Sequence, residues 1–178
     1  MDRRSFIKSS TASAISLGVG FSLFNNEVIA SNTYFGNPWI KIHQDNSITL
    51  TNSRTEMGQD VYTSISLLIA EELDCSLDAI RIEAAPFDPT NHGNAMLGGL
   101  QLTGASTSVA GSWGSMRKVG ATVRTMLISA AAKKWNVAVS SCSTNNGYVM
   151  SGAKRARYGE LVDLLRQEPI PKDPALKN

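Results

Sequence analysis

The feature that most limits the fold of this chain is a repeated change in the spacing of its apolar residues. Residues 39–43 alternate between apolar and polar, Asp45-Asn46 is a turn pair, and residues 47–51 alternate again. From Val61 to Leu73 the apolar residues recur at helical spacing, and residues 79–84 return to alternation. The pattern predicts a β-hairpin, then an amphipathic helix, then a further strand.

The next segment, residues 86–111, has no clear period and is dense in Gly, Ser, Thr and Asn. A loop of this length inside a compact domain is usually either functional or disordered. Ser112 is a good N-cap residue, and the apolar residues that follow it predict a second long helix as far as Trp135.

The C-terminal part predicts a second hairpin, formed by residues 137–143 and 148–150 around Asn146-Gly147, and a short helix over residues 158–166. Residues 169–178 are punctuated by proline and have the composition of a linker. Because most strands come as hairpins, we expect an α+β fold: a hairpin-rich mixed sheet with two longer helices packed on it.

The N-terminus has the parts of an export signal. Arg3 and Arg4 are adjacent, residues 11–24 are apolar and uncharged, and a small residue, Ala30, stands at the expected cleavage point. A basic region, an apolar region and a small-residue cleavage site define a secretory signal, and the arginine pair indicates the twin-arginine type. We expect residues 1–30 to direct the chain to the periplasm; an uncleaved N-terminal anchor is the alternative.

Roughly 148 residues remain, enough for one domain, which we place at residues 31–168. Outside residues 1–30 the basic and acidic residues number 14 and 13, so the domain is nearly neutral and lacks the basic stripe of a nucleic-acid-binding protein. Cys75 and Cys142 are far apart and read as small core residues, and His43 and His92 as surface or loop residues. No His/Cys cluster with metal-ligand spacing occurs, so no metal site is predicted.

Two segments carry chemistry. The first, residues 55–60, lies between a predicted strand and a predicted helix and contains Gly58 and Gln59. A glycine before a helix lets a ligand approach the backbone, where free N–H groups attract anions, and the Gln59 amide both donates and accepts. An ordinary turn is the alternative.

The second segment, residues 103–108, has four hydroxyl side chains in six residues and leads into Gly111-Ser112-Trp113. Short hydroxyl side chains beside glycines are suited to line a polar ligand that carries a phosphate or a pterin. An exposed flexible loop is the alternative.

Together these segments resemble the N-terminal part of the large molybdopterin-binding subunit of the xanthine dehydrogenase/aldehyde oxidase family, in the exported branch typified by the isoquinoline 1-oxidoreductase β subunit. The resemblance covers nearly all of the chain after residue 30. The residues that carry it are Glu56-Met57-Gly58-Gln59, Ala70-Glu71-Glu72-Leu73-Asp74, Ala84-Ala85-Pro86, the run from Thr103 to Trp113, Met126-Leu127-Ile128, Ala130-Ala131-Ala132 and Tyr158-Gly159-Glu160-Leu161.

The resemblance implies a fold that is part of a larger molybdenum-cofactor-binding domain, with both segments packed against the pterin. The contacts it implies are Gly58, Gln59, Thr103, Ala105, Ser106 and Ser108. The chain departs from the family pattern at two positions: Asp60 stands where a glycine is usual, and Ala110 where an arginine is usual. A carboxylate at position 60 is electrostatically unfavourable beside a phosphate-bearing cofactor.

The implied reaction is hydroxylation of a carbon next to nitrogen or oxygen in an N-heterocycle or aldehyde, with electrons leaving through a separate iron–sulfur subunit. The cofactor performs the difficult step, and the protein orients it and supplies a general base. The family's base is a glutamate beyond the part matched here, and Glu56 is not assigned that role. The chain is therefore expected to be a component that is inactive alone and needs the rest of its subunit; the alternatives are a non-catalytic remnant or assembly module and a periplasmic binding domain for an unrelated small molecule.

Overall fold

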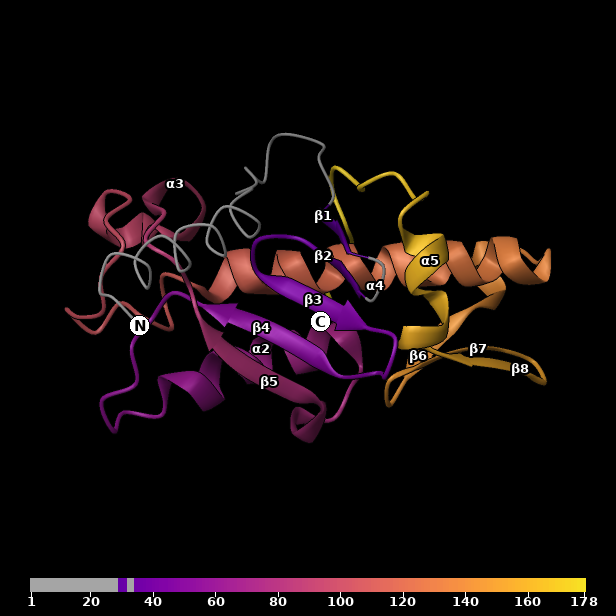
Figure 1. Ribbon diagram of the computed structural model, residues 1–178, viewed down its shortest axis with the longest axis horizontal. Coiled ribbons are helices and arrows are strands. Elements are labelled where there is room, and N and C mark those ends of the chain that lie inside the picture. Colours follow the sequence, from indigo (N-terminus) through magenta and orange to yellow (C-terminus); the bar gives the residue numbers. More distant parts are fainter. Residues whose placement is uncertain (1–28, 32–33) are drawn as a thin grey trace, which may run out of the picture.

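The computed structural model describes residues 29–31 and 34–178, so Arg3 and Arg4 lie outside the described residues. Figure 1 shows a larger sheet lying in front of the long helix α4, and a smaller sheet near one end of that helix. The larger sheet has the strand order β1-β2-β3-β4-β5. Its strands are β1 (Ile29–Ser31), β2 (Tyr34–Gly36), β3 (Ile40–His43), β4 (Ile48–Asn52) and β5 (Ile80–Ala84).

The hairpin predicted over residues 39–51 is confirmed. β3 and β4 pair antiparallel, and their turn contains Asn46 at φ 72°, a left-handed conformation that asparagine tolerates. β4 and β5 instead pair parallel, with Asn52 opposite Ala84. Parallel neighbours need a crossover, which α2 (Val61–Leu73) provides. The segments that follow β4 and β5 therefore both start at the same edge of the sheet.

Both predicted long helices are confirmed, α2 and α4 (Trp113–Trp135). They pack directly on each other: a Cβ on Gly120 would lie 2.6 Å from the Cβ of Glu72, so only glycine permits this approach. No helix among the described residues is long and apolar enough to cross a membrane. The core between the helices and the larger sheet includes Ile40, Ile42, Ile48, Leu50, Ile65, Ile69, Leu73, Met116, Val123, Met126 and Leu127.

The smaller sheet differs from the predicted second hairpin. Its strands are β6 (Ser143–Asn145), β7 (Tyr148–Ser151) and β8 (Lys154–Arg157), in that order. The turn at Asn146-Gly147 is confirmed, but the strand predicted over residues 137–143 is wrong, because residues 139–141 form a 3-10 turn. β7 ends at Ser151, where Gly152 (φ 57°) turns the chain into β8, so residues before 143 have no strand to pair with.

Two further segments also differ from expectation. The predicted helix over residues 158–166 is a 3-10 turn (Tyr158–Leu161) followed by the single turn α5 (Val162–Leu165). The loop over residues 86–111 contains two short helical turns, α3 (Pro89–His92) and a 3-10 turn (Ala95–Leu97). With a mostly antiparallel sheet, a second small sheet and two long helices, the predicted α+β class is confirmed.

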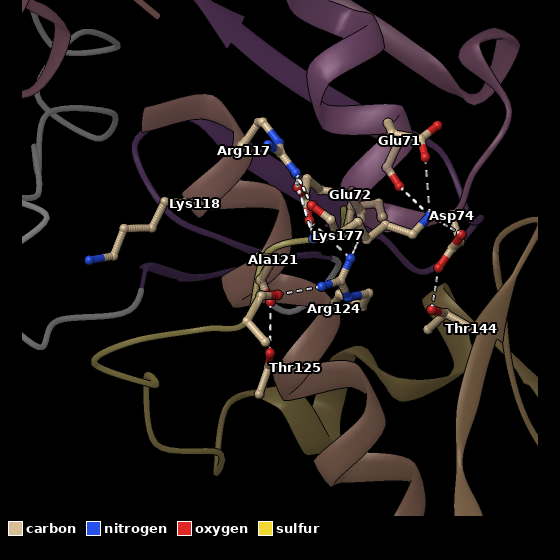
Figure 2. Close-up of polar contacts among 12 residues, drawn as sticks. Glu71, Glu72, Asp74, Arg117, Lys118, Ala121, Arg124, Thr125, Thr144 and Lys177 are labelled. Atoms are coloured by element: carbon tan, nitrogen blue, oxygen red, sulfur yellow. Dashed lines mark hydrogen bonds and ion pairs between the residues drawn. The ribbon is translucent and has the colours of Figure 1, made fainter. Parts of the chain in front are cut away.

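Residues 169–178 contain neither helix nor strand, and the end of this segment is bound to the folded domain (Figure 2). The Lys177 Nζ donates to Asp74 Oδ1 at 2.5 Å, and its backbone N–H donates to Glu72 Oε2 at 3.2 Å. Glu72 itself is fully buried and also accepts from Arg117 Nε at 2.8 Å and from Arg124 Nη1 at 3.0 Å. The C-terminal end of α2 thus binds both α4 and the chain terminus through carboxylates.

Candidate functional site

The two segments singled out in the sequence meet at the edge of the sheet where β4 and β5 end. The backbone N–H of Thr55 donates to Oγ1 of Thr103 at 2.7 Å, across 48 positions of sequence. The parallel pairing places these segments together, because residues 53–60 follow β4 and residues 85–111 follow β5. The structure therefore brings the first residues of the two predicted segments, Thr55 and Thr103, into contact.

The first segment is organised around Glu56. Its Oε1 accepts from the backbone N–H groups of Gly58 (2.7 Å), Gln59 (2.9 Å) and Asp60 (3.1 Å). Its Oε2 accepts from the N–H of Tyr62 at 3.1 Å. The prediction of free N–H groups at this helix start is therefore wrong, because the chain's own carboxylate binds them. The hydrogen bond from Tyr62, with those from the turn, lowers the pKa of Glu56.

The side chain of Gln59 also stabilises the turn through hydrogen bonds to its backbone. Its Oε1 accepts from the N–H of Met57 at 2.5 Å, and its Nε2 donates to the carbonyl of Thr55 at 2.9 Å. Gly58 has φ 91°, and no atom lies within 4 Å of where its Cβ would be. The turn therefore presents an open backbone face at Gly58, while one N–H of the Gln59 amide remains available to a ligand.

Asp60, which stands in place of the family's usual glycine, has φ 57° and lies at the N-cap of α2. This left-handed conformation favours glycine, the residue that the resemblance implies here. The Asp60 side chain is exposed and makes no capping hydrogen bond.

The second segment contains two consecutive left-handed residues, Ala105 (φ 53°) and Ser106 (φ 55°), both exposed. Such conformations cost roughly 1–2 kcal/mol for a residue other than glycine and recur at functional sites. Thr107 holds the loop: its Oγ1 donates to the carbonyl of Gly104 at 3.0 Å and accepts from Nδ2 of the fully buried Asn94 at 2.7 Å. The half-buried Ser108 follows directly.

A cleft of about 410 Å³ opens between the two segments. Thr103 lines it, whereas Gly58, Gln59, Ala105, Ser106 and Ser108 do not. The lining residues are Asn52, Ser53, Arg54, Thr55, Met57, Tyr62, Ala84, Ala85, Phe87, Gln101, Leu102 and Thr103. None of these is an Asp or a Glu.

Arg54 is a charged residue of this cleft that was not predicted from the sequence. Only 2% of its surface is exposed, and its guanidinium donates to the carbonyls of His92 (3.3 Å), Gly93 (3.3 Å) and Leu102 (3.5 Å). It therefore ties the end of β4 to the loop that carries Thr103. An arginine in the polar run Asn52-Ser53-Arg54 gives no sequence signal of burial.

His92 was also misread. It lies in the loop as expected, but it is 2% exposed and packs edge-on against Trp39, with ring centroids 4.4 Å apart. Burial lowers its pKa, Asp88 opposes that shift, and the nearby Arg54 adds to it. Cys75 and Cys142 are half-buried free thiols packed against the core.

Comparison with known proteins identifies the family. The family model of the molybdopterin cofactor-binding domain matches residues 1–174. The chain is 34% identical over 128 residues to the isoquinoline 1-oxidoreductase subunit beta of Brevundimonas diminuta, covering 71% of this chain and 16% of that protein. It is 26% identical over 169 residues to the membrane-bound aldehyde dehydrogenase (pyrroloquinoline-quinone) of Gluconacetobacter polyoxogenes, covering 91% of this chain and 21% of that protein.

The fold has a solved counterpart in quinoline 2-oxidoreductase from Pseudomonas putida 86. The TM-score is 0.54 at 20% identity, over 69% of this chain and 15% of that one. The chain thus spans about a fifth or less of the length of the proteins it matches. The family model confirms both the predicted resemblance and the predicted cofactor class, and the chain belongs to the molybdopterin cofactor-binding domain family.

Proposed function

We propose that this chain supplies part of the molybdopterin-binding surface of a molybdenum hydroxylase that acts on an N-heterocycle or an aldehyde. The observation that carries the proposal is the hydrogen bond from Thr55 to Thr103, which joins the two segments implied in cofactor contact. Family membership and the similarity to an isoquinoline 1-oxidoreductase subunit support the reaction class.

The residues at the cleft fit a phosphate-bearing pterin. The lining offers hydroxyl and amide groups, and it lacks carboxylates that would repel a phosphate. Two of the lining residues, Asn52 and Arg54, each carry a buried donor, Nδ2 and Nε respectively, that has no hydrogen-bond partner. The helix start at Gly58 is not a phosphate site, because Glu56 fills it, so Gly58 contributes an open backbone face instead.

In this proposal the Thr103 hydroxyl and the free N–H of Gln59 orient the cofactor, with Ala105, Ser106 and Ser108 on its flank. When bound, the cofactor supplies the redox chemistry of the hydroxylation. Glu56 stays ionised through its four backbone hydrogen bonds and is a poor general base. The base therefore comes from the remainder of the subunit, and the chain alone is inactive.

We further propose that the partners are the remainder of the molybdopterin-binding subunit and an iron–sulfur subunit, and that the complex is exported to the periplasm. The arginine pair Arg3-Arg4 and the uncharged stretch 11–24 support export. Strand β1 spans Ile29–Ser31, so cleavage after Ala30 leaves only Ser31 of that outer strand.

The test is co-expression of this chain with the polypeptide that completes the subunit and with the iron–sulfur subunit, followed by purification and molybdenum analysis. We expect molybdenum in proportion to the complex, and no hydroxylation of heterocycles or aldehydes by the chain alone. An intact but metal-free complex contradicts the proposal and favours the alternative, a non-catalytic remnant or assembly module.

A further inference from the structure

We propose that Arg54 and Asn52 form an anion-binding floor in the cleft, which takes the phosphate or carboxylate group of a ligand whose flat ring system lies against the apolar rim. The inference rests on the proposed function only in naming the natural ligand, whose anionic group would be the cofactor phosphate. Neither residue belongs to the segments implied by the family resemblance.

The first step is the charge of Arg54. This side chain is 98% buried, and its partners are three carbonyls at 3.3 to 3.5 Å. Within the described part of the chain, Arg54 makes no ion pair with an Asp or Glu. Burial alone lowers its pKa. A buried charge without a counter-charge costs several kcal/mol, and an anion bound nearby offsets that cost.

Three partly buried arginines provide a contrast with Arg54, because each pairs with a carboxylate. Arg166, whose side chain is 23% exposed, pairs with Asp163. Arg117 and Arg124, whose side chains are 20% and 12% exposed, both pair with the buried carboxylate of Glu72 (Figure 2). The fold therefore supplies a counter-charge to arginines that are less buried than Arg54. Among the buried and half-buried arginines that the structure describes, Arg54 lacks such a counter-charge, and it lines the cleft.

The second step is the pair of unused donors. Arg54 Nε and Asn52 Nδ2 are both buried without a partner, although buried donors are nearly always paired. Asn52 is oriented by its other end, since its Oδ1 accepts from the N–H of Arg54 at 3.0 Å. The Arg54 contact with the Leu102 carbonyl is 3.5 Å, at the limit of a hydrogen bond, so exchanging it for an anion costs little.

The third step is the rim. Met57, Phe87 and Leu102 line the cleft with 68%, 83% and 38% of their surfaces exposed. Exposed apolar side chains around a polar floor fit a ligand with a flat ring system and one anionic group. Thr55 and Thr103 also line the cleft and carry neutral hydroxyl groups.

The test is isothermal titration of the full chain with inorganic phosphate and, separately, with benzoate. Asn52→Asp is the decisive variant, because it keeps the acceptor for the Arg54 N–H while placing a negative charge beside the floor. We expect it to weaken binding of both anions about tenfold or more, with a melting temperature no lower than that of the wild type. Arg54→Met weakens binding too but also removes the carbonyl contacts. Arg81→Met, which removes one exposed positive charge on β5 outside the cleft, leaves binding unchanged.

Stronger binding of phosphate than of benzoate indicates the cofactor phosphate as the natural ligand, and the reverse order indicates a carboxylate ligand. Absence of binding by the wild type, or equal binding by Asn52→Asp, overturns the site. If Asn52→Asp does not fold, Asn52→Ala removes the Nδ2 donor, together with the acceptor for the Arg54 N–H, without adding a charge. Undiminished binding by Asn52→Ala likewise overturns the site. A metal-free assembled complex overturns the proposed function while leaving the outcome of these titrations intact.

Discussion

The backbone N–H of Thr55 and the hydroxyl of Thr103 are 2.7 Å apart and join the segment after β4 to the loop before α4. The hydrogen bonds from the Arg54 side chain to carbonyl groups of the loop join the same two segments, which form the two sides of the cleft. The separation of 48 positions means that the loop depends on such contacts for its place.

Replacement of Thr103 by valine tests this contact. Valine has the same shape but no acceptor, so the Thr55 N–H loses its partner at a cost of about 1 kcal/mol. We expect hydrogen exchange at the Thr55 amide to become about fivefold faster or more, with a smaller change at amides of α4. Thr103→Ser keeps the hydroxyl and serves as the control; equal exchange rates in all three proteins contradict the assignment.

The left-handed conformation of Asp60 predicts different stabilities for its glycine and alanine variants. At φ 57° glycine is unstrained, whereas alanine has neither that freedom nor a polar group to bond locally. Asp60→Gly should therefore be more stable than Asp60→Ala by about 1 kcal/mol, measured by urea unfolding. In the assembled complex Asp60→Gly should also raise molybdenum occupancy, because it removes a carboxylate from the cofactor turn. A lower occupancy contradicts the electrostatic argument.

Gln59→Ala removes both side-chain contacts of the turn, leaving the Met57 N–H and the Thr55 carbonyl without that partner. We expect lower molybdenum occupancy in the assembled complex, measured by metal analysis of the purified protein. Gln44→Ala is the matched control, since Gln44 is exposed and its contact with Asp163 is 3.5 Å. Unchanged occupancy in Gln59→Ala removes this residue from the cofactor site.

Glu72 is the residue on which the helix pair most depends. Its side chain is fully buried, and its carboxylate pairs with both Arg117 and Arg124. Glu72→Gln therefore leaves two partly buried cations without a counter-charge. We expect a loss of about 3 kcal/mol in unfolding free energy, measured with urea. Glu71→Gln, at a side chain 74% exposed, should cost less than about 1 kcal/mol. Similar losses in the two variants contradict a central role for Glu72.

Local patterns predicted the two long helices and several strands of this fold, and non-local contacts set the rest. The α2 and α4 helices and the β3–β4 hairpin follow from apolar spacing within each segment, which is why all three were predicted. The parallel pairing of β4 with β5 has no such local signal. Residues 137–142 include the β-forming Val137 and Val139, but β7 ends at Ser151 and offers them no partner.

The candidate site divides in the same way. The two segments were identified from composition and resemblance, but their meeting depends on the β4–β5 pairing. The burial of Arg54 and His92 depends on the path of the loop over residues 86–111, which no periodicity predicts. The role of Glu56 in binding the backbone of the turn could have been predicted from the sequence. A carboxylate two residues before Gly58 is within reach of the N–H groups of the turn.

Glu56 makes the turn sensitive to pH. Its backbone hydrogen bonds favour the ionised form and lower its pKa below the ordinary value of 4.5. A group whose pKa is lower in the folded state contributes stability above its unfolded pKa and loses that contribution as the pH falls through its folded pKa. The wild type should therefore lose melting temperature as the pH falls from about 4.5 through the lowered pKa of Glu56. Glu56→Gln should start lower at neutral pH and show a flatter profile in this range, because its amide does not titrate. Parallel profiles for the two proteins between pH 6 and the acid limit of folding would show that Glu56 does not bind the N–H groups of the turn.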